Sequence, residues 1–359
     1  VRSDGTVSVM RGASVPEDFA EGRAMRPVCR SPPTTPPAAA AAGTTQLPGY
    51  PLRGPDPGTF VSVAKPATRS RSASVAVWRA SHPSSVRARS VLEAQLRHGL
   101  QAGELQLHYQ PIVDGAGRMV GAEALLRWHH PQRGMVPPAE FIPLAEQSGL
   151  ILPLGRWVME QACAQLVAWA GSAATRHLVL SVNVSVRQFR QADFADHVLH
   201  ALRGSGARAR QLKIELTESL WLSDAEEAIA KMDLLRAHGV GFALDDFGTG
   251  YSSLSYLKRL PLDQLKIDRS FVRDVLSDPN DAAIARTIVA LGTSLGLQVI
   301  AEGVETEAQR QFLEDQSCHV WQGYLLSPPV PVRSFEALVR EAAPAQRPPA
   351  LSPACLTQP

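Results

Sequence analysis

Cysteine is scarce in this 359-residue chain, and its four cysteines show no paired spacing. Because no Cys-x-x-Cys pair is present, neither a disulfide framework nor a thiolate zinc site is expected. The chain also lacks any run of about 18 apolar residues, so it contains no predicted membrane span. Its N-terminus lacks the charged-then-apolar pattern of a signal peptide. Together these absences predict a cytoplasmic protein whose thiols stay reduced.

Basic residues are outnumbered in the central part of the chain. Residues 91–343 contain 23 Lys and Arg against 29 Asp and Glu, whereas residues 1–90 contain twelve basic and five acidic residues. The central segment is therefore mildly acidic, and a basic nucleic-acid-binding surface is not expected. The fold must accommodate this excess of acid, and much of it falls within a few short motifs.

Composition divides the chain into three parts. Residues 1–90 are rich in Pro, Ala, Ser and Arg and show no sustained hydrophobic period of a helix or a strand. Such a segment buries too little apolar surface to offset its conformational entropy, so we predict disorder there and in the proline-rich tail 344–359. A remnant of an upstream domain around residues 75–78 is the alternative. Residues 91–343 are predicted to form the folded domain.

Short apolar runs alternate with amphipathic stretches between residues 91 and 343. A helix at 91–102 precedes eight predicted strands, at 105–113, 120–126, 178–184, 212–216, 240–244, 265–267, 299–301 and 320–326. Further helices are predicted at 154–169, 224–238, 282–295 and 305–314. This alternation indicates an α/β protein with a parallel sheet, and eight strands in about 250 residues fit a TIM-type (β/α)8 barrel. An open doubly wound sheet is the alternative fold.

Most of the predicted strands end in a carboxylate or an amide. The residues at these ends are Glu123, Asn183, Glu215, Asp245, Asp246, Asp268 and Glu302. The carboxyl ends of parallel barrel strands share one face, which hosts active sites, so these side chains are expected to converge. Two unit charges about 4 Å apart repel by about 4 kcal/mol at an effective dielectric of about 20, so an acid ring needs protons or cations. Oxygen ligands select hard ions, which predicts Mg²⁺ or Mn²⁺ rather than zinc.

A simpler interpretation is that each acid merely caps a helix or solvates a loop. It explains any single residue, but it explains the series badly because turns more often begin with Gly, Asn or Pro. The pair Asp245–Asp246 is the most diagnostic, since neighbouring strand residues point to opposite faces. Lys266 also lies within a predicted strand, where a cation is costly unless it meets the acids. A lysine that extends to the rim of the barrel is the alternative.

A glycine-rich stretch, Asp246-Phe-Gly-Thr-Gly-Tyr-Ser-Ser253, directly follows the first of the paired acids. Its backbone could approach a phosphate group closely. The Asp-Phe-Gly triplet also occurs in protein kinases, but the chain has no kinase nucleotide loop and no His-Arg-Asp catalytic loop. A kinase is therefore excluded.

Several motifs stand in the order found in one protein family. They are Tyr109-Gln-Pro-Ile-Val113, Glu123-Ala-Leu-Leu-Arg127, Glu140-Phe-Ile-Pro-Leu-Ala-Glu146, Asn183-Val-Ser185, Glu215-Leu-Thr-Glu-Ser219, the stretch 245–253, Lys266-Ile-Asp268, Glu302-Gly-Val-Glu305 and Gln322-Gly-Tyr324. Together they resemble the EAL domain, the family of bacterial phosphodiesterases specific for cyclic di-GMP. The resemblance covers residues 93–343. A departure lies before the last strand, where Asp-Gln-Ser-Cys318-His319 replaces the usual Gly-Cys-Asp.

The resemblance implies hydrolysis of one phosphodiester bond of cyclic di-GMP to linear pGpG, in a barrel whose first strand runs antiparallel. It implies two ions, Mg²⁺ or Mn²⁺, held by Glu123, Asn183, Glu215, Asp245, Asp246 and Glu302. A water near Lys266 would attack phosphorus, with support that the family pattern assigns to Glu302, Glu305 and Gln322. The family pattern also makes Glu218 the anchor of the glycine-rich loop, and its substrate contacts would be Gln110, Leu125 and Arg127.

Two other functions compete with hydrolysis. A catalytically silent cyclic di-GMP receptor or scaffold is the main alternative, although degenerate EAL domains of that kind usually lose metal ligands and every ligand position is filled here. An enolase-like barrel that uses Lys266 and the acids on a small carboxylic acid is a third hypothesis. The resemblance is also consistent with a homodimer formed near the glycine-rich loop.

Overall fold

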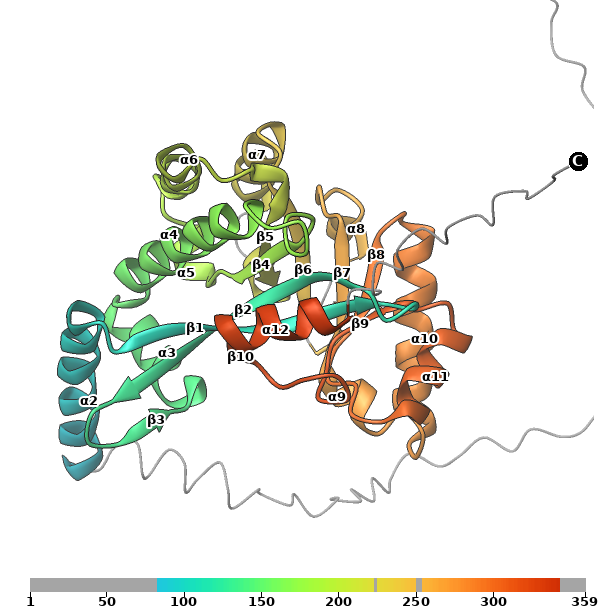
Figure 1. Ribbon diagram of the computed structural model, residues 1–359, viewed down its shortest axis with the longest axis horizontal. Coiled ribbons are helices and arrows are strands. Elements are labelled where there is room, and N and C mark those ends of the chain that lie inside the picture. Colours follow the sequence, from blue (N-terminus) through green and yellow to red (C-terminus); the bar gives the residue numbers. More distant parts are fainter. Residues whose placement is uncertain (1–82, 223–224, 250–253, 343–359) are drawn as a thin grey trace, which may run out of the picture. The chain divides into compact units, whose positions relative to one another are not determined.

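The computed structural model describes residues 83–222, 225–249 and 254–342 (Figure 1). The predicted disorder of residues 1–90 falls mostly outside these ranges, and that of the tail 344–359 falls wholly outside them. Helix α2 (Pro83–Ala102) begins before the predicted residue 91 and leads directly toward the first strand. The domain boundaries inferred from composition therefore stay predictions.

Eight strands close into a barrel. They are β1 (Leu105–Asp114), β2 (Met119–His130), β4 (Val179–Asn183), β5 (Leu212–Thr217), β6 (Gly241–Phe247), β7 (Gln264–Ile267), β8 (Gln298–Ala301) and β9 (Val320–Trp321). Neighbours pair in the order β1-β9-β8-β7-β6-β5-β4-β2, and the pairing of β1 with β2 closes the ring. The other seven barrel strands pair in parallel with one another, whereas β1 runs antiparallel to its barrel neighbours β2 and β9. The predicted (β/α)8 barrel with an antiparallel first strand is confirmed.

The last barrel strand is shorter than predicted. Because β9 covers only Val320–Trp321, the prediction of a strand over 320–326 is wrong beyond Trp321. The chain turns where Gly323 meets the loop after β8: a Cβ added to Gly323 would lie 2.0 Å from the Val304 carbonyl oxygen. Leu325 N donates a hydrogen bond to that same oxygen. The backbone after Trp321 therefore bonds to this loop and does not extend the sheet.

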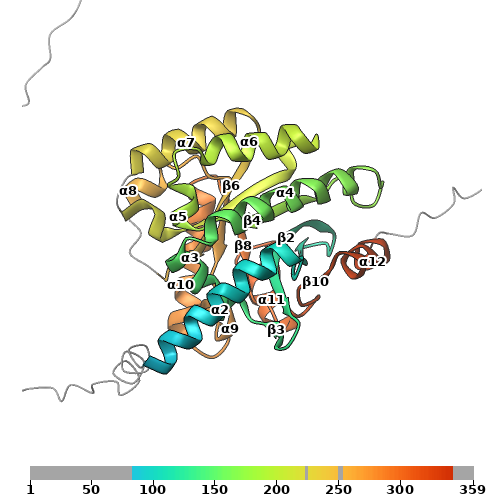
Figure 2. The same ribbon diagram turned by 90° about the vertical axis from the view of Figure 1, so that its left-hand side faces the viewer.

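Helices cover the outside of the barrel. The predicted helical stretches correspond to α4 (Ile151–Ala170), α7 (Ala225–Ala237), α10 (Pro279–Ser294) and α11 (Glu307–Asp315). The structure adds elements that the sequence did not predict: β3 (Gly134–Val136), α3 (Pro138–Ser148), α5 (Val186–Phe189), α6 (Phe194–Ser205), α8 (Leu254–Leu257), α9 (Arg269–Arg273), β10 (Val330–Pro331), α12 (Val332–Ala342) and the 3₁₀ turns η1 (Ala209–Gln211) and η2 (Glu218–Leu222). Helices α4, α6 and α7 lie together on one flank (Figure 2). Among the helices in the described ranges, none has the length and apolarity that a membrane crossing needs.

The barrel interior is apolar only in a thin layer. Ile112, Ile300 and Val320 form a small buried cluster of their own, separate from the main core outside the strands. Ile300 of β8 is the cross-strand partner of Lys266 on β7, so the two side chains lie on the same face of the sheet. The polar site therefore rests on this apolar layer.

An aromatic cluster joins α4, β1 and α12 in the outer core. Trp169 stacks on Phe335 with ring centroids 5.1 Å apart, and it meets Tyr109 edge-on at 5.4 Å. All three rings are almost fully buried. Their contacts hold the last helix against the antiparallel strand, where the barrel closes.

We predict that Trp169→Ala lowers the free energy of unfolding by about 3–5 kcal/mol, the usual cost of deleting a large buried aromatic side chain. Equilibrium denaturation measures this change. Val167→Ala on the same helix is the control: Val167 is 41% exposed, and such surface changes stay within about 0.5 kcal/mol. Equal losses in the two variants would contradict the packing described.

Candidate active site

A buried lysine lies at the centre of the acids that end the strands. Lys266 on β7 has no exposed surface, and its Nζ lies 2.6 Å from Glu215 Oε2 and 3.1 Å from Asp245 Oδ1. Glu123 Oε2 is 3.6 Å away, and Glu302 also pairs with this amine. The alternative of a lysine that extends to the rim is therefore wrong. Lys266 with these four acids is called the Lys266 cluster below.

Two amides complete the hydrogen bonding around Glu123. Asn183, the last residue of β4, donates from Nδ2 to Glu123 Oε1 at 2.5 Å, and Gln322 donates from Nε2 to Glu123 Oε2 at 2.6 Å. The pairing of β4 with β5 sets Asn183 beside Glu215. Glu123 lies in the part of β2 that pairs with β4, Asn183 and Glu215 lie toward the ends of β4 and β5, and Gln322 directly follows β9. The predicted convergence on one face is therefore observed.

Asp246 reaches the site through an unusual backbone conformation. Its φ of 53° is in the left-handed region, which non-glycine residues seldom adopt. The pairing of β6 with β7 shifts register between Leu244 and Phe247, the mark of a bulge at the strand end. Carboxylate oxygens of Asp245, Asp246 and Glu302 consequently lie within 4.8 Å of one another. Strain of this kind often accompanies functional sites.

The site holds more acid than one lysine balances. Burial opposes the charge of Lys266, yet the surrounding carboxylates hold its pKa well above the ordinary value. Burial raises the pKa of Glu302 well above its usual range and that of Glu215 to about 8. Burial, and then repulsion from Asp245, raises the pKa of Asp246 to about 6. A divalent cation would relieve the cost of ionising these groups together.

The donor set fits a hard divalent ion. Two buried side-chain oxygens in the site, Glu215 Oε1 and Gln322 Oε1, have no hydrogen-bond partner among the residues that the structure describes. Buried polar atoms normally have one, so these two fit a site whose partner is a cation. The ligands on offer are carboxylate and amide oxygens, which suit Mg²⁺ or Mn²⁺ and not a thiolate-preferring metal.

A cavity of about 520 Å³ opens beside the acids and is lined by Leu125, Arg127, Asn183, Glu215 and Thr217 among others. Its volume is in the usual range for small-molecule sites. Arg127 is half-buried, and burial lowers its pKa from the ordinary value. Gln110 is buried nearby on the face of Glu123, its cross-strand partner, and donates to the Ser327 carbonyl oxygen at 3.3 Å. Two of the predicted substrate contacts, Leu125 and Arg127, thus face a cavity of suitable size.

The remaining predicted residues fall into two groups. Glu218 Oε1 accepts a hydrogen bond from Gly248 N at 2.7 Å, so it does contact the glycine-rich loop, of which residues 250–253 lie outside the described ranges. Glu305 is exposed, and within the described residues its side chain makes no ion pair or hydrogen bond with the Lys266 cluster. No contact among the described residues supports the predicted role of Glu305, which stays a prediction.

Asp268 is a neighbour of the site to which the sequence assigned no role, although it stood in the strand-end series. Its side chain is hydrogen-bonded to Asp246 and contributes to the raised pKa of that residue. Asp268 also caps α9, where it accepts from Ser270 N at 3.0 Å. The only signal for Asp268 in the sequence is its position at a strand end. That position does not distinguish a residue that caps a helix from one that binds a metal ion.

Comparison with known proteins identifies the family to which this barrel belongs. Residues 93–329 match the family model described as the EAL domain. The chain belongs to the EAL domain family. It is 47% identical over 246 residues to the bifunctional diguanylate cyclase/cyclic di-GMP phosphodiesterase MucR of Pseudomonas aeruginosa, which covers 68% of this chain and 36% of MucR. It is 42% identical over 261 residues to the cyclic di-GMP phosphodiesterase NbdA of the same organism, which covers 71% of this chain and 33% of NbdA.

Solved EAL structures share the fold. The MucR phosphodiesterase in complex with cyclic di-GMP matches with a TM-score of 0.66 and 46% identity, covering 67% of this chain and 98% of that one. The EAL enzyme Bd1971 in its form bound to cAMP and cyclic di-GMP matches with a TM-score of 0.68 and 35% identity, covering 71% and 70%. The resemblance found in the sequence is confirmed. This EAL chain spans about a third of the length of the curated relatives MucR and NbdA.

We predict that Lys266→Met destabilises the EAL domain by about 3–5 kcal/mol in EDTA, because removal of one partner leaves buried charges uncompensated. Added Mg²⁺ or Mn²⁺ should recover part of the loss, since a cation that binds only the folded state stabilises it. Denaturant unfolding with and without metal measures both effects. A variant as stable as the parent in EDTA would show that Lys266 does not balance the acids.

The raised pKa of Asp246 generates a pH-dependent prediction. In EDTA the folded protein holds the proton on the Asp246 carboxyl more tightly than the unfolded chain, whose carboxyls titrate at about pH 4. The stability that the proton contributes is therefore present at low pH and lost as the pH rises from about 4 to about 6. We predict that Asp246→Asn unfolds at a higher temperature than the parent above pH 6 and that the gain shrinks toward pH 4. A gain independent of pH would contradict this account.

Proposed function

We propose that this EAL domain hydrolyses one phosphodiester bond of cyclic di-GMP, yielding linear pGpG, with two divalent ions that are Mg²⁺ or Mn²⁺. The observation that carries the proposal is the convergence of an excess of acids on Lys266 beside a cavity of about 520 Å³. The names of MucR and NbdA, which include cyclic di-GMP phosphodiesterase, support the same substrate and reaction.

The site residues divide into two ligand sets in this proposal. We propose that the first ion is held by Glu123, Asn183, Glu215 and Asp245. The second ion is held by Asp245, Asp246 and Glu302. When bound, the ions would supply a deprotonated water and stabilise charge on the phosphoryl oxygens. The contact of Asp246 N with Asp245 Oδ1 at 3.0 Å and the bulge after Leu244 support this division, because they turn two adjacent carboxylates toward one space.

The role proposed for Lys266 is to orient the attacking water. The carboxylates keep the pKa of its amine high, so the amine serves as a hydrogen-bond donor and not as a base. Glu302 is kept as the general base that takes the proton lost by the water, on the family resemblance. Gln322 holds Glu123 through the 2.6 Å hydrogen bond, which fixes the orientation of that ligand. Glu305 is kept as a support of the second ion on the family resemblance alone.

We propose that the substrate binds in the cavity beside the acids. Arg127 is charged there and suits a phosphate group, and Leu125 supplies an apolar wall. Gln110 is assigned to the substrate from the family pattern. Glu218 is to anchor the glycine-rich loop through its contact with Gly248. A homodimer near that loop and a cytoplasmic location stay predictions.

A cyclic di-GMP receptor that binds without cutting is the second candidate. It predicts tight nucleotide binding with no linear product in Mg²⁺ or Mn²⁺. The unpartnered buried oxygens and the raised pKa values favour the enzyme, because a site without ions would gain little from so many acids. None of the relatives named above supports enolase-like chemistry.

We predict that the protein converts cyclic di-GMP to pGpG in Mg²⁺ or Mn²⁺ and that Glu123→Ala lowers turnover by more than about 100-fold, because it removes a ligand and not merely a supporting contact. Chromatography of the nucleotides after timed incubation measures both. Glu160→Ala, which removes an exposed acid on α4, is the control and should keep the parental rate. Intact cyclic di-GMP after incubation of the parent with either ion would contradict the proposal.

A further inference from the structure

A four-residue helix begins directly after the turn that follows Asn183. Ser185 and Gln188 cap this helix, α5, reciprocally. Gln188 Oε1 accepts hydrogen bonds from Ser185 N at 3.2 Å and from Ser185 Oγ at 2.9 Å, and Gln188 N donates to Ser185 Oγ at 3.2 Å. The Gln188 side chain is buried. One side chain therefore fixes the turn two residues beyond the end of β4.

The Gln188 side chain occupies a notch in α4. A Cβ added to Gly155 would lie 1.5 Å from Gln188 Nε2 and 2.4 Å from Gln188 Cδ. Gly155 lies within a regular helix, where glycine is less favourable than alanine, and its φ is not in the left-handed region. Conformation therefore does not require glycine at this position. Space does, because Gly155 leaves the room that the amide of Gln188 fills.

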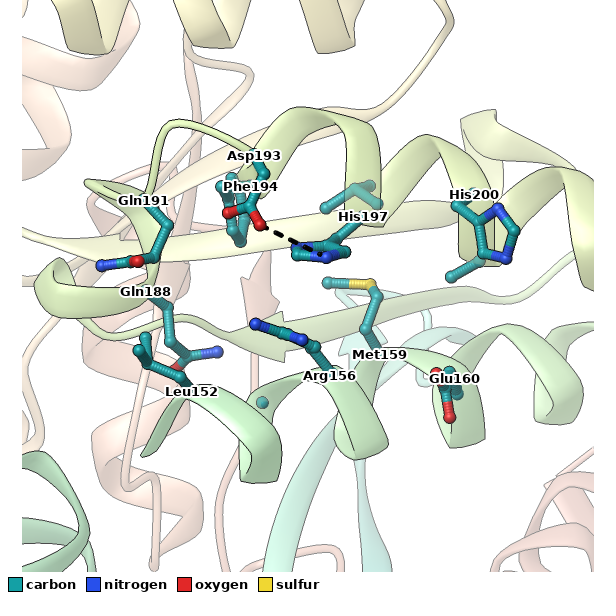
Figure 3. Close-up of a pocket in the computed structure, with 13 residues that line it drawn as sticks. Leu152, Arg156, Met159, Glu160, Gln188, Gln191, Asp193, Phe194, His197 and His200 are labelled. Carbon is teal, nitrogen blue, oxygen red and sulfur yellow. Dashed lines mark ion pairs between the residues drawn. The ribbon is translucent and has the colours of Figure 1, made fainter. Parts of the chain in front are cut away.

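Gln188 separates the candidate active site from an outer groove. Figure 3 shows this groove, which Gln188 lines together with Leu152 and Arg156 of α4. The same Gln188 and Gly155 also line the cavity that contains Asn183. A change made at Gly155 thus reaches the turn after Asn183 through one side chain, without touching the Lys266 cluster.

The other end of α5 is held independently. Lys231 of α7 donates from Nζ to the carbonyl oxygens of Phe189 and Gln191, at 3.2 Å and 3.0 Å. Because this end is fixed, displacement of the Gln188 amide must be absorbed at the beginning of the helix. That beginning is the turn joined to Asn183.

We infer that Gln188, seated against Gly155, is a positioning residue that orients Asn183 and thereby sets the affinity of the site for its divalent ion. The inference rests on the proposed role of Asn183 as a ligand. Gln188 itself touches neither ion nor substrate. Groups that orient a metal ligand typically change metal affinity by about 10–100-fold when they are replaced.

Binding of Mn²⁺ to the full chain tests the inference without reference to activity. The loss of the electron paramagnetic resonance signal of free Mn²⁺ gives the dissociation constant. Gly155→Ala and Gln188→Ala are each expected to weaken binding by about 10-fold or more. Since the added methyl acts through Gln188, the double variant should bind no more weakly than Gln188→Ala alone.

Gly204→Ala is the matched control, because it is the same substitution within a helix, at a position where an added Cβ meets no atom of the described residues within 4 Å. It should bind Mn²⁺ like the parent.

Parental affinity in both single variants, or additive losses in the double variant, overturns the inference even if the parent cleaves cyclic di-GMP. If Gly155→Ala fails to fold, Gln188→Ala alone decides. A parent that binds Mn²⁺ but leaves cyclic di-GMP intact overturns the proposed function, while weaker binding by the variants still supports the inference.

Discussion

The contact between the buried amine of Lys266 and the carboxylates around it is the interaction on which the rest of the structure depends. The closed barrel brings acids on β2, β5 and β6 and directly after β8 within 3.6 Å of one amine, because adjacent strand ends meet around a ring. The same contact is incomplete, since one amine cannot balance four ionised carboxyl groups. The fold therefore carries an electrostatic cost, which protons on acids of raised pKa such as Glu215 relieve and which divalent ions can relieve in their place.

Backbone geometry refines what the barrel positions approximately. The left-handed conformation of Asp246 and the bulge after Leu244 add a second carboxylate at the end of one strand. The close approach of Gly323 to Val304 ends β9 early, so that Gln322 can meet Glu123. At Gly155 the missing side chain admits the amide that caps α5. Each of these features places one polar group, and each relies on a contact between segments distant in the sequence or on a rare backbone conformation.

Much of the site could be predicted because its signal is local. An apolar run followed by a carboxylate marks a strand end wherever it occurs, and the barrel then sends all such ends to one face. What the sequence could not reveal depends on tertiary contacts. The apolar run after Trp321 predicts a longer strand, and only its packing on Val304 shows why it stops. Asp268 has the pattern of a ligand but caps a helix, and the partnership of Gly155 with Gln188 leaves no periodic trace.

The central claim is that these strand ends form one site for divalent ions. The most direct measurement is anomalous X-ray diffraction from crystals of the protein grown with Mn²⁺ and cyclic di-GMP. The account predicts two anomalous peaks, one bounded by Glu123, Asn183, Glu215 and Asp245 and the other by Asp245, Asp246 and Glu302. Crystals that bind cyclic di-GMP in the cavity but show no anomalous peak among these residues would contradict it.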